Sequence, residues 1–297
     1  MRQRPQINPI YRRPEIDGLR AIAVLVIILY HAKIVIFGRD WFEGGYIGVD
    51  IFFVISGYLI TRIILEELFK TGSFSFLNFY ERRVRRILPM LFTVMLVTFP
   101  FAWKYLLPAN FLEYSKSILS AVLFSSNFFF YFVTTEYGAE SALLKPFLHT
   151  WSLGVEEQFY IVFPILLVFF YKFLRKHMFI LFSAMLLLSL LFSHAMSMQN
   201  VSLNFYLPMS RFWELLVGSI LAYFELKRGR VQSRLVKTIF PIIGFYFVAY
   251  SILFFEASTP HPSLITLIPI IGSAFIIAFA SKEDFVGKVL GSKPFIG

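Results

Sequence analysis

The chain has 297 residues, 58% of them hydrophobic and 38 of them phenylalanine, with a mean hydropathy of +0.70, which excludes a soluble globular domain. Apolar runs of about 18–22 residues recur along it, which indicates an all-α polytopic membrane protein and excludes an outer-membrane barrel with alternating strands. The net charge of +10 is read as a topology signal and not as nucleic-acid binding, and a sequence without cysteine offers no disulfide, thiol nucleophile or thiolate metal site.

The N-terminal segment, residues 1–13, is basic, and the positive-inside bias predicts that it is cytoplasmic. Its arginines are Arg2, Arg4, Arg12 and Arg13. Residues 14–297 are expected to form one transmembrane domain.

The first predicted span covers about residues 16–37 and carries Asp17, Arg20 and His31. Arg20 and His31 are separated by eleven positions, which places them roughly 20° apart on one helix face and about 16 Å apart along the axis. Asp17 lies within about 40° of His31 by the same geometry. A structural interpretation stays open, in which Arg20 snorkels, Asp17 caps the helix and His31 bonds a carbonyl. Ionisable groups are costly in a bilayer, so three in register favour a functional site.

The second predicted span, about 46–67, carries Asp50 near its outer end, where we expect His31, and Arg62 near its inner end, where we expect Arg20. A cytoplasmic loop, 68–86, then ends in a cluster of arginines. Three interpretations fit such a cluster: a topology anchor, a contact with anionic lipid, or a clamp for phosphate. The cluster consists of Arg82, Arg83, Arg85 and Arg86.

Six further spans follow, with one ambiguous region between the first two of them. Residues 109–148 contain an apolar run too short to cross, which predicts a re-entrant or interfacial segment on the outer side. The total is eight full spans and one partial one, and the sequence stops on a link that leads toward another span, so the domain is expected to be incomplete. The six spans cover about 87–107, 150–171, 178–196, 205–225, 238–256 and 263–281.

Two more polar constellations interrupt these spans. At the start of the span near residue 150, His149 and Glu156 share a helix face. At least one of the adjacent Glu156 and Glu157 is expected to face a polar cavity or to be protonated by burial. For Ser152 and Glu157 a structural role that ties helices together stays open beside a place in the cavity wall. Arg211 and Glu214, three residues apart, are expected to form an internal ion pair. With His31 and Asp50, these residues fall at the outer ends of the spans, and the arginines fall at the inner ends. The pattern suggests a polar route across the membrane, whose cytoplasmic end binds anions and whose outer end carries acid–base groups.

These motifs resemble the acyltransferase-3 family of bacterial integral-membrane O-acyltransferases, over roughly residues 14–297. The resemblance rests on the segments 15–24, 48–58, 83–89, 149–160 and 211–218, together with His31. It implies acetyl-CoA as a cytoplasmic donor substrate, with no tightly bound cofactor, and a sugar hydroxyl of an extracytoplasmic glycan, such as lipopolysaccharide O-antigen or peptidoglycan, as acceptor. It also implies catalytic importance for Arg20 and His31, and donor binding by the arginines before residue 87. Members usually have ten or more helices, and many carry an SGNH-type esterase domain after them. This chain departs from that pattern, so a partner of the SGNH type and activity of the chain alone both stay open.

The expected activity is therefore O-acetyl transfer in the bacterial cytoplasmic membrane. His31 would act as general base or hold the acetyl group, oriented by Asp50, His149 or Glu156. Arg62 would assist donor binding. The alternative is a channel or transporter that supplies acyl groups to a separate SGNH-type transferase. The sequence offers no P-loop, metal-binding cluster or Ser-His-Asp triad.

Overall fold

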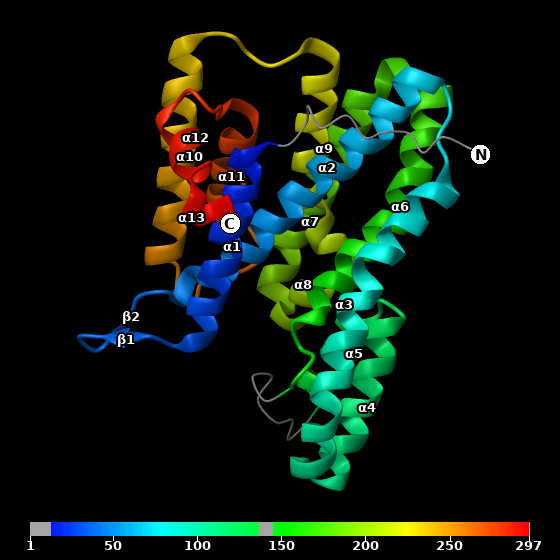
Figure 1. The fold of residues 1–297 in the computed structure, drawn as a ribbon, viewed down its shortest axis with the longest axis vertical. Coiled ribbons are helices and arrows are strands. Elements are labelled where there is room, and N and C mark those ends of the chain that lie inside the picture. Colours follow the sequence, from blue (N-terminus) through cyan, green and yellow to red (C-terminus); the bar gives the residue numbers. More distant parts are fainter. Residues whose placement is uncertain (1–12, 137–144, 297) are drawn as a thin grey trace. The chain divides into compact units, whose positions relative to one another are not determined.

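The computed structural model describes residues 13–136 and 145–296, and helices dominate this part of the chain (Figure 1). Within it, five helices are long and apolar enough to cross a membrane. The protein is an all-α polytopic membrane protein. The N-terminal arginines Arg2, Arg4 and Arg12 lie outside the described residues.

Each of the eight predicted spans falls on a helix. Those that meet the length and composition of a membrane span within the described chain are α2, α3, α6, α7 and α10; α1 and α9 carry several charges, and α11 is shorter. The eight helices are α1 (Pro14–Ala32), α2 (Gly48–Thr71), α3 (Phe76–Tyr105), α6 (Thr150–Phe173), α7 (Met178–Gln199), α9 (Pro208–Arg228), α10 (Arg234–Phe254) and α11 (Leu267–Phe279).

Helix α3 corrects the predicted cytoplasmic loop, because it begins eleven residues before the expected span and contains the arginine cluster. Ser75 caps its first turn by accepting a hydrogen bond from the Asn78 amide. Hydropathy marks only the apolar part of a helix, whereas backbone hydrogen bonding continues through charged residues.

Two other segments differ from the prediction. The partial span is two short helices, α4 (Pro108–Val122) and α5 (Ser126–Thr135). The span expected at 205–225 begins in the short helix α8 (Val201–Tyr206) and restarts after Leu207, because proline at the first turn lacks the amide that would continue α8.

The remaining described elements are short. They are the paired strands β1 (Val35–Ile36) and β2 (Arg39–Asp40), the 3₁₀ turns η2 (Glu43–Ile47), η4 (Arg175–His177) and η5 (Leu264–Thr266), and the helices α12 (Phe285–Leu290) and α13 (Lys293–Ile296).

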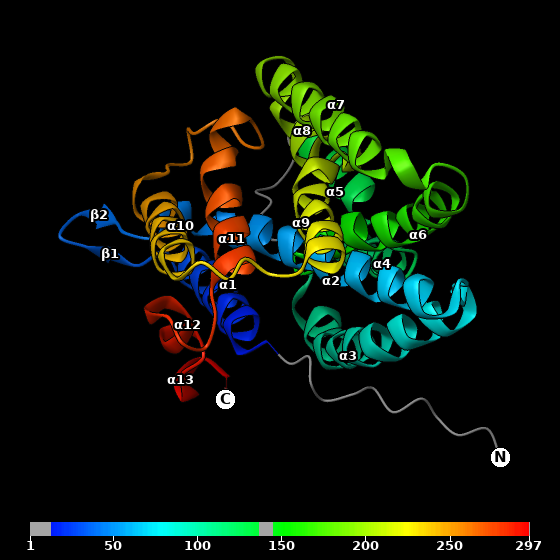
Figure 2. The same cartoon turned by 90° about the horizontal axis from the view of Figure 1, so that it is seen from above.

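The chain forms two compact units. The first contains Met1–Ile55, Arg228–Thr259 and Leu267–Gly297. Glycines permit close helix contacts in it: a Cβ on Gly244 would lie 2.5 Å from the Gly272 carbonyl oxygen, and one on Gly272 would lie 2.7 Å from that of Gly244. Small residues of this kind let membrane helices approach closely, and α10 lies beside α11 as a result (Figure 2).

The second unit contains Ser56–Lys227 and Pro260–Thr266. Here Gly57 of α2 packs against the backbone of Leu215 in α9, where an added Cβ would lie 1.8 Å from the Leu215 oxygen. Helix α5 packs against α6 and α8, and Asn127 at its start bonds Gln158 of α6 and the Tyr206 carbonyl. These contacts fix the positions of the polar residues of α6 and α9.

Candidate active site

Helix α1 is continuous from Pro14 to Ala32, so the predicted stripe of Asp17, Arg20 and His31 lies on a single helix. Arg20 Nη1 lies 3.9 Å from Asp17 Oδ1, and both side chains are 29% exposed. His31 lies in the last turn, is exposed, and meets the Tyr30 ring edge-on at 5.0 Å between centroids. An exposed imidazole next to the end of a helix is accessible to a substrate.

Asp50 occupies the first turn of α2 and is fully buried, where the positive end of the helix dipole favours a carboxylate. The packing of glycines sets its level against α1: Gly45 contacts Val26 and Tyr30, and Gly48 contacts Ala23 and Ile27. Continuing this antiparallel register places Asp50 near the level of Ala23, about 12 Å of helical rise from His31.

Asp50 is therefore closer in level to Arg20 than to His31, whereas the sequence placed it at the level of His31; a role of Asp50 in orienting His31 stays a prediction. The sequence predicted both residues at the outer ends of their spans. It did not reveal that the 3₁₀ turn η2 at residues 43–47 packs against α1 first, so that α2 starts deeper than its apolar run suggests.

The second unit assembles a polar cluster around Glu156. The Ser56 hydroxyl donates to Glu156 Oε1 at 3.2 Å, and the Tyr160 hydroxyl donates to Oε2 at 3.1 Å. His149 stands at the N-terminal cap of the same helix, α6, and is exposed. Ser152 donates back to the His149 carbonyl at 3.2 Å. Glu156 is thus a fixed, doubly hydrogen-bonded carboxylate.

Arg83 joins this cluster from α3. Its guanidinium carbon lies 4.0 Å from the centre of the Tyr160 ring, a cation–π contact. Glu157 is buried, with 7% of its surface exposed, and its carboxyl group interacts electrostatically with Arg83 and Arg86. The predicted division between inner arginines and outer carboxylates is therefore wrong at this point, since Arg83 and the two glutamates lie together.

The other arginines of the cluster are more accessible. Arg82, Arg85 and Arg86 are exposed, and Arg85 forms an ion pair of 2.6 Å with Glu81 one turn earlier. Arg82 and Arg86 therefore present charge to the surroundings of α3, as anion binding requires.

Arg62 is engaged within the second unit. Its Nε lies 2.7 Å from Glu66 and its Nη1 lies 3.0 Å from Glu225, and the Tyr58 hydroxyl accepts from Nη1 at 2.7 Å. Tyr58 in turn donates to Glu225 at 2.9 Å. Two carboxylates already neutralise Arg62, so its contacts tie α2 to α9.

Arg211 and Glu214 form the ion pair that their spacing predicts, at 3.2 Å with both side chains fully buried. Arg211 also donates to the Phe205 carbonyl at 3.2 Å and lies over the rings of Trp151 and Phe205. A guanidinium buried away from water is stable only when several partners compensate for its lost hydration.

His261 was not predicted from the sequence, and its Nε2 lies 2.9 Å from Arg211 Nη1. An arginine can only donate, so Nε2 accepts and the ring proton resides on Nδ1, 3.2 Å from the Thr266 hydroxyl. Burial, and after it the charge of Arg211, holds the pKa of His261 well below its ordinary value, with Glu214 acting in the opposite direction. The signal available in the sequence was a histidine between two prolines, at 260–262.

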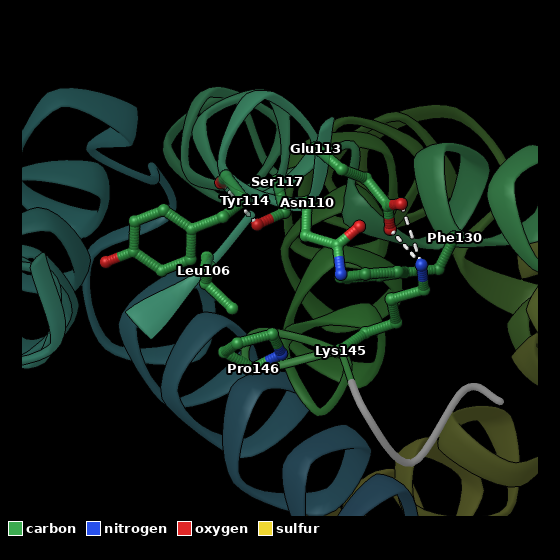
Figure 3. A pocket seen from close by; sticks show the side chains of 8 residues that line it. All are labelled: Leu106, Asn110, Glu113, Tyr114, Ser117, Phe130, Lys145 and Pro146. Carbon is green, nitrogen blue, oxygen red and sulfur yellow. Dashed lines mark hydrogen bonds and ion pairs between the residues drawn. The ribbon is translucent and has the colours of Figure 1, made fainter. Parts of the chain in front are cut away.

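A pocket beside α4 is lined by Glu113 and Lys145, whose amine lies between the two carboxylate oxygens at 2.6 and 2.7 Å (Figure 3). Its free volume of about 30 Å³ corresponds to one water molecule. The ion pair therefore fastens the segment before α6 to α4 and leaves no room for a substrate.

Comparison with known proteins gives a family and several relatives. The sequence model of the acyltransferase-3 family, described as an acyltransferase domain, matches residues 13–292. O-acetyltransferase OatA of Staphylococcus aureus (strain NCTC 8325 / PS 47) is 32% identical over 84% of this chain and 45% of its own length. "Putative O-acetyltransferase SACOL0978" of S. aureus (strain COL) is 34% identical over 92% of this chain and 49% of its own length.

No solved structure matches the chain significantly. The chain spans about half the length of the curated relatives it matches. A family match over nearly all of the described residues, together with relatives above 30% identity, shows that this chain belongs to the acyltransferase-3 family.

Proposed function

We propose that this chain is the membrane domain of an O-acetyltransferase that transfers an acetyl group from cytoplasmic acetyl-CoA to a hydroxyl of an extracytoplasmic glycan. The observation that carries the proposal is the family match over residues 13–292, together with two relatives whose names are O-acetyltransferases. The acceptor would be a lipid-linked or surface glycan such as peptidoglycan or lipopolysaccharide O-antigen.

The chemistry assigned to α1 is proton transfer. His31 would accept the proton of the sugar hydroxyl as it attacks the thioester carbonyl, or would carry the acetyl group between donor and acceptor. Its exposure at the last turn of α1 supports this role. Arg20, whose Nη1 lies 3.9 Å from Asp17 Oδ1, would stabilise negative charge on the reacting groups.

The chemistry assigned to α3 is donor binding. The exposed side chains of Arg82 and Arg86 suit the phosphates of coenzyme A, because planar guanidinium groups bind phosphate oxygens in pairs. Arg62 is a weaker candidate for donor binding than its sequence position suggested, since its guanidinium already forms ion pairs with Glu66 and Glu225. A transmembrane route that joins these arginines to His31 stays a prediction.

The orientation that we propose places the N-terminus in the cytoplasm of a bacterium and the domain in its cytoplasmic membrane. The positive charge of the segments 1–13, 82–86 and 227–237 supports one common side of the membrane for these segments.

The test is mass spectrometry of cell-surface glycans from a strain with and without the complete gene, followed by assay of the purified complete protein with acetyl-CoA and the glycan so identified. Loss of O-acetyl groups on deletion, and transfer by the purified protein alone, are expected. Unchanged glycan acetylation on deletion would contradict the proposal.

The alternative that the sequence left open is a transporter that supplies acetyl groups to a separate esterase-fold transferase. Transfer that occurs only when a second protein or domain is added would establish it.

A further inference from the structure

An apolar groove lies between α3 and α6 in the second unit, with a free volume of about 290 Å³. It is open along one side. Its walls are Ile87, Met90, Leu91 and Val94 of α3, and Phe147, His149, Thr150 and Leu153 at the start of α6. Because Arg83 meets Tyr160 while Val94 and His149 line the same groove, the two helices run antiparallel.

The helix register extends this groove to the polar cluster. On α3, Arg83 lies one turn before Ile87 on the same face, and on α6, Glu157 lies one turn after Leu153 on the same face. Long side chains connect the two helices there: Tyr80 donates to the Tyr160 carbonyl at 3.2 Å. The groove is therefore mostly apolar and ends at Ile87 and Leu153, one helical turn from Arg83 and Glu157, while His149 lines its other end.

Two buried polar atoms at the Arg83 end have no hydrogen-bond partner among the described residues: Arg83 Nε, a donor, and Glu157 Oε1, an acceptor. Buried polar groups are nearly always hydrogen-bonded, so such a pair needs an explanation. A ligand that satisfies both must offer an acceptor and a donor close together, as an amide does. The apolar groove next to them does not suit a sugar, which carries hydroxyls on every side.

The distance from the polar pair at Arg83 and Glu157 to His149 selects among amide-bearing chains. From Glu157 to His149 the helical rise is about 12 Å. In acyl-CoA, about nine bonds separate the pantoyl amide from the thioester carbon. An extended polypeptide covers about 3.5 Å per residue, which is three bonds, so this part of the pantetheine arm spans about 11 Å when extended.

We propose that the α3–α6 groove binds the pantetheine arm of the acyl-CoA donor, with its pantoyl amide between Arg83 and Glu157 and its thioester at the level of His149. This assignment rests on the proposed function, which supplies acyl-CoA as donor. It gives Glu157 a binding role and explains why Arg83 turns inward while Arg82 and Arg86 remain exposed for the phosphates.

The test uses the absence of cysteine in this sequence. Single cysteines replace Val94, which lines the groove, and Leu96, which lies two residues away on the exposed side of α3. The complete protein, with any cysteine outside these 297 residues replaced by serine, is treated with the methyl disulfide of coenzyme A. The protein thiolate attacks the coenzyme A sulfur, a protein–coenzyme A disulfide forms and methanethiolate leaves. Intact-mass spectrometry measures the rate of adduct formation.

We expect Val94→Cys to form the adduct at least about tenfold faster than Leu96→Cys, because binding raises the local concentration of the reagent. Excess acetyl-CoA should slow only Val94→Cys. Equal rates, or no protection, in a protein that still binds radiolabelled acetyl-CoA would overturn the groove assignment and leave the proposed function intact. A parent protein that neither binds acetyl-CoA nor transfers acetyl groups would instead refute the proposed function.

Two further measurements test which molecule occupies the groove and whether Glu157 binds it. Labelling of Val94→Cys by a thiol-reactive phospholipid and not by the coenzyme A reagent would mean that the groove holds a lipid chain, which overturns the proposal. Glu157→Leu should raise the KM for acetyl-CoA about tenfold, the loss of one buried hydrogen bond, and Glu157→Gln, which keeps an acceptor oxygen, should restore most of it. An unchanged KM in Glu157→Leu would refute the proposed hydrogen bond between the pantoyl amide and Glu157.

Discussion

Replacing Arg211 by methionine tests whether the buried cluster of α9 is held together as described. Arg211 is fully buried, lies 3.2 Å from Glu214 and 2.9 Å from His261, and donates to the Phe205 carbonyl. Methionine keeps much of the apolar volume over the Trp151 ring but removes the charge and every donor.

The expected loss of stability is about 3–5 kcal/mol, the usual cost of removing one partner from a buried ion pair. It is a large share of a typical folding free energy of about 5–15 kcal/mol. The double variant Arg211→Met/Glu214→Leu removes both charges. We expect it to be more stable than Arg211→Met alone by about 1–3 kcal/mol, because the carboxylate no longer lacks its cation.

The assay is thermal unfolding of the purified protein in detergent, with Arg211→Lys as the matched control that keeps the charge and shortens the reach. The order expected for the melting temperature is wild type, then Arg211→Lys, then the double variant, then Arg211→Met. A double variant less stable than Arg211→Met would refute the assignment of Glu214 as the main electrostatic partner.

Three further predictions concern neighbouring contacts. The pKa of His261 is lower in the folded protein than in the unfolded chain, so the unfolded chain binds the extra proton first as the pH falls. The free energy of unfolding should therefore decrease by up to about 1.4 kcal/mol per pH unit as the pH drops below 6.5 toward the folded pKa. His261→Asn should flatten this part of a pH series of melting curves, and an unchanged slope would contradict the assignment of this pH dependence to His261. Gly57→Ala places a Cβ 1.8 Å from the Leu215 oxygen and should destabilise by about 1–3 kcal/mol despite its better helix propensity, so an unchanged melting temperature would show that the contact is not as close. Arg62→Gln removes the cation between two carboxylates and should cost about 1–3 kcal/mol, partly recovered by adding Glu225→Gln; no recovery would contradict the described ion pairing.

The sequence predicted the helices well because hydrophobic length is a strong signal in a bilayer. It placed eight spans, and each falls on a helix. It was wrong about the start of α3 and the break before Pro208, because neither apolarity nor charge marks where backbone hydrogen bonding begins or stops.

The candidate site was predictable along one helix and not between helices. Spacing alone placed Arg20 and His31 on one stripe and predicted the pair of Arg211 with Glu214. The partners of Glu156, by contrast, include Ser56, one hundred residues away. Helical periodicity says nothing of such pairs, since the relative depth of two helices depends on how their glycines and turns pack.

The most direct test of the central claim is the acetylation of cell-surface glycans in cells whose only copy of the complete protein carries His31→Ala. Protein levels are matched by immunoblot, and His177→Ala, in the exposed turn η4, serves as control. We expect glycan O-acetyl content to fall about a hundredfold or more in His31→Ala, the scale of a lost acid–base group, and to stay normal in His177→Ala. Normal acetylation in His31→Ala would contradict the claim that α1 carries the chemistry of acetyl transfer.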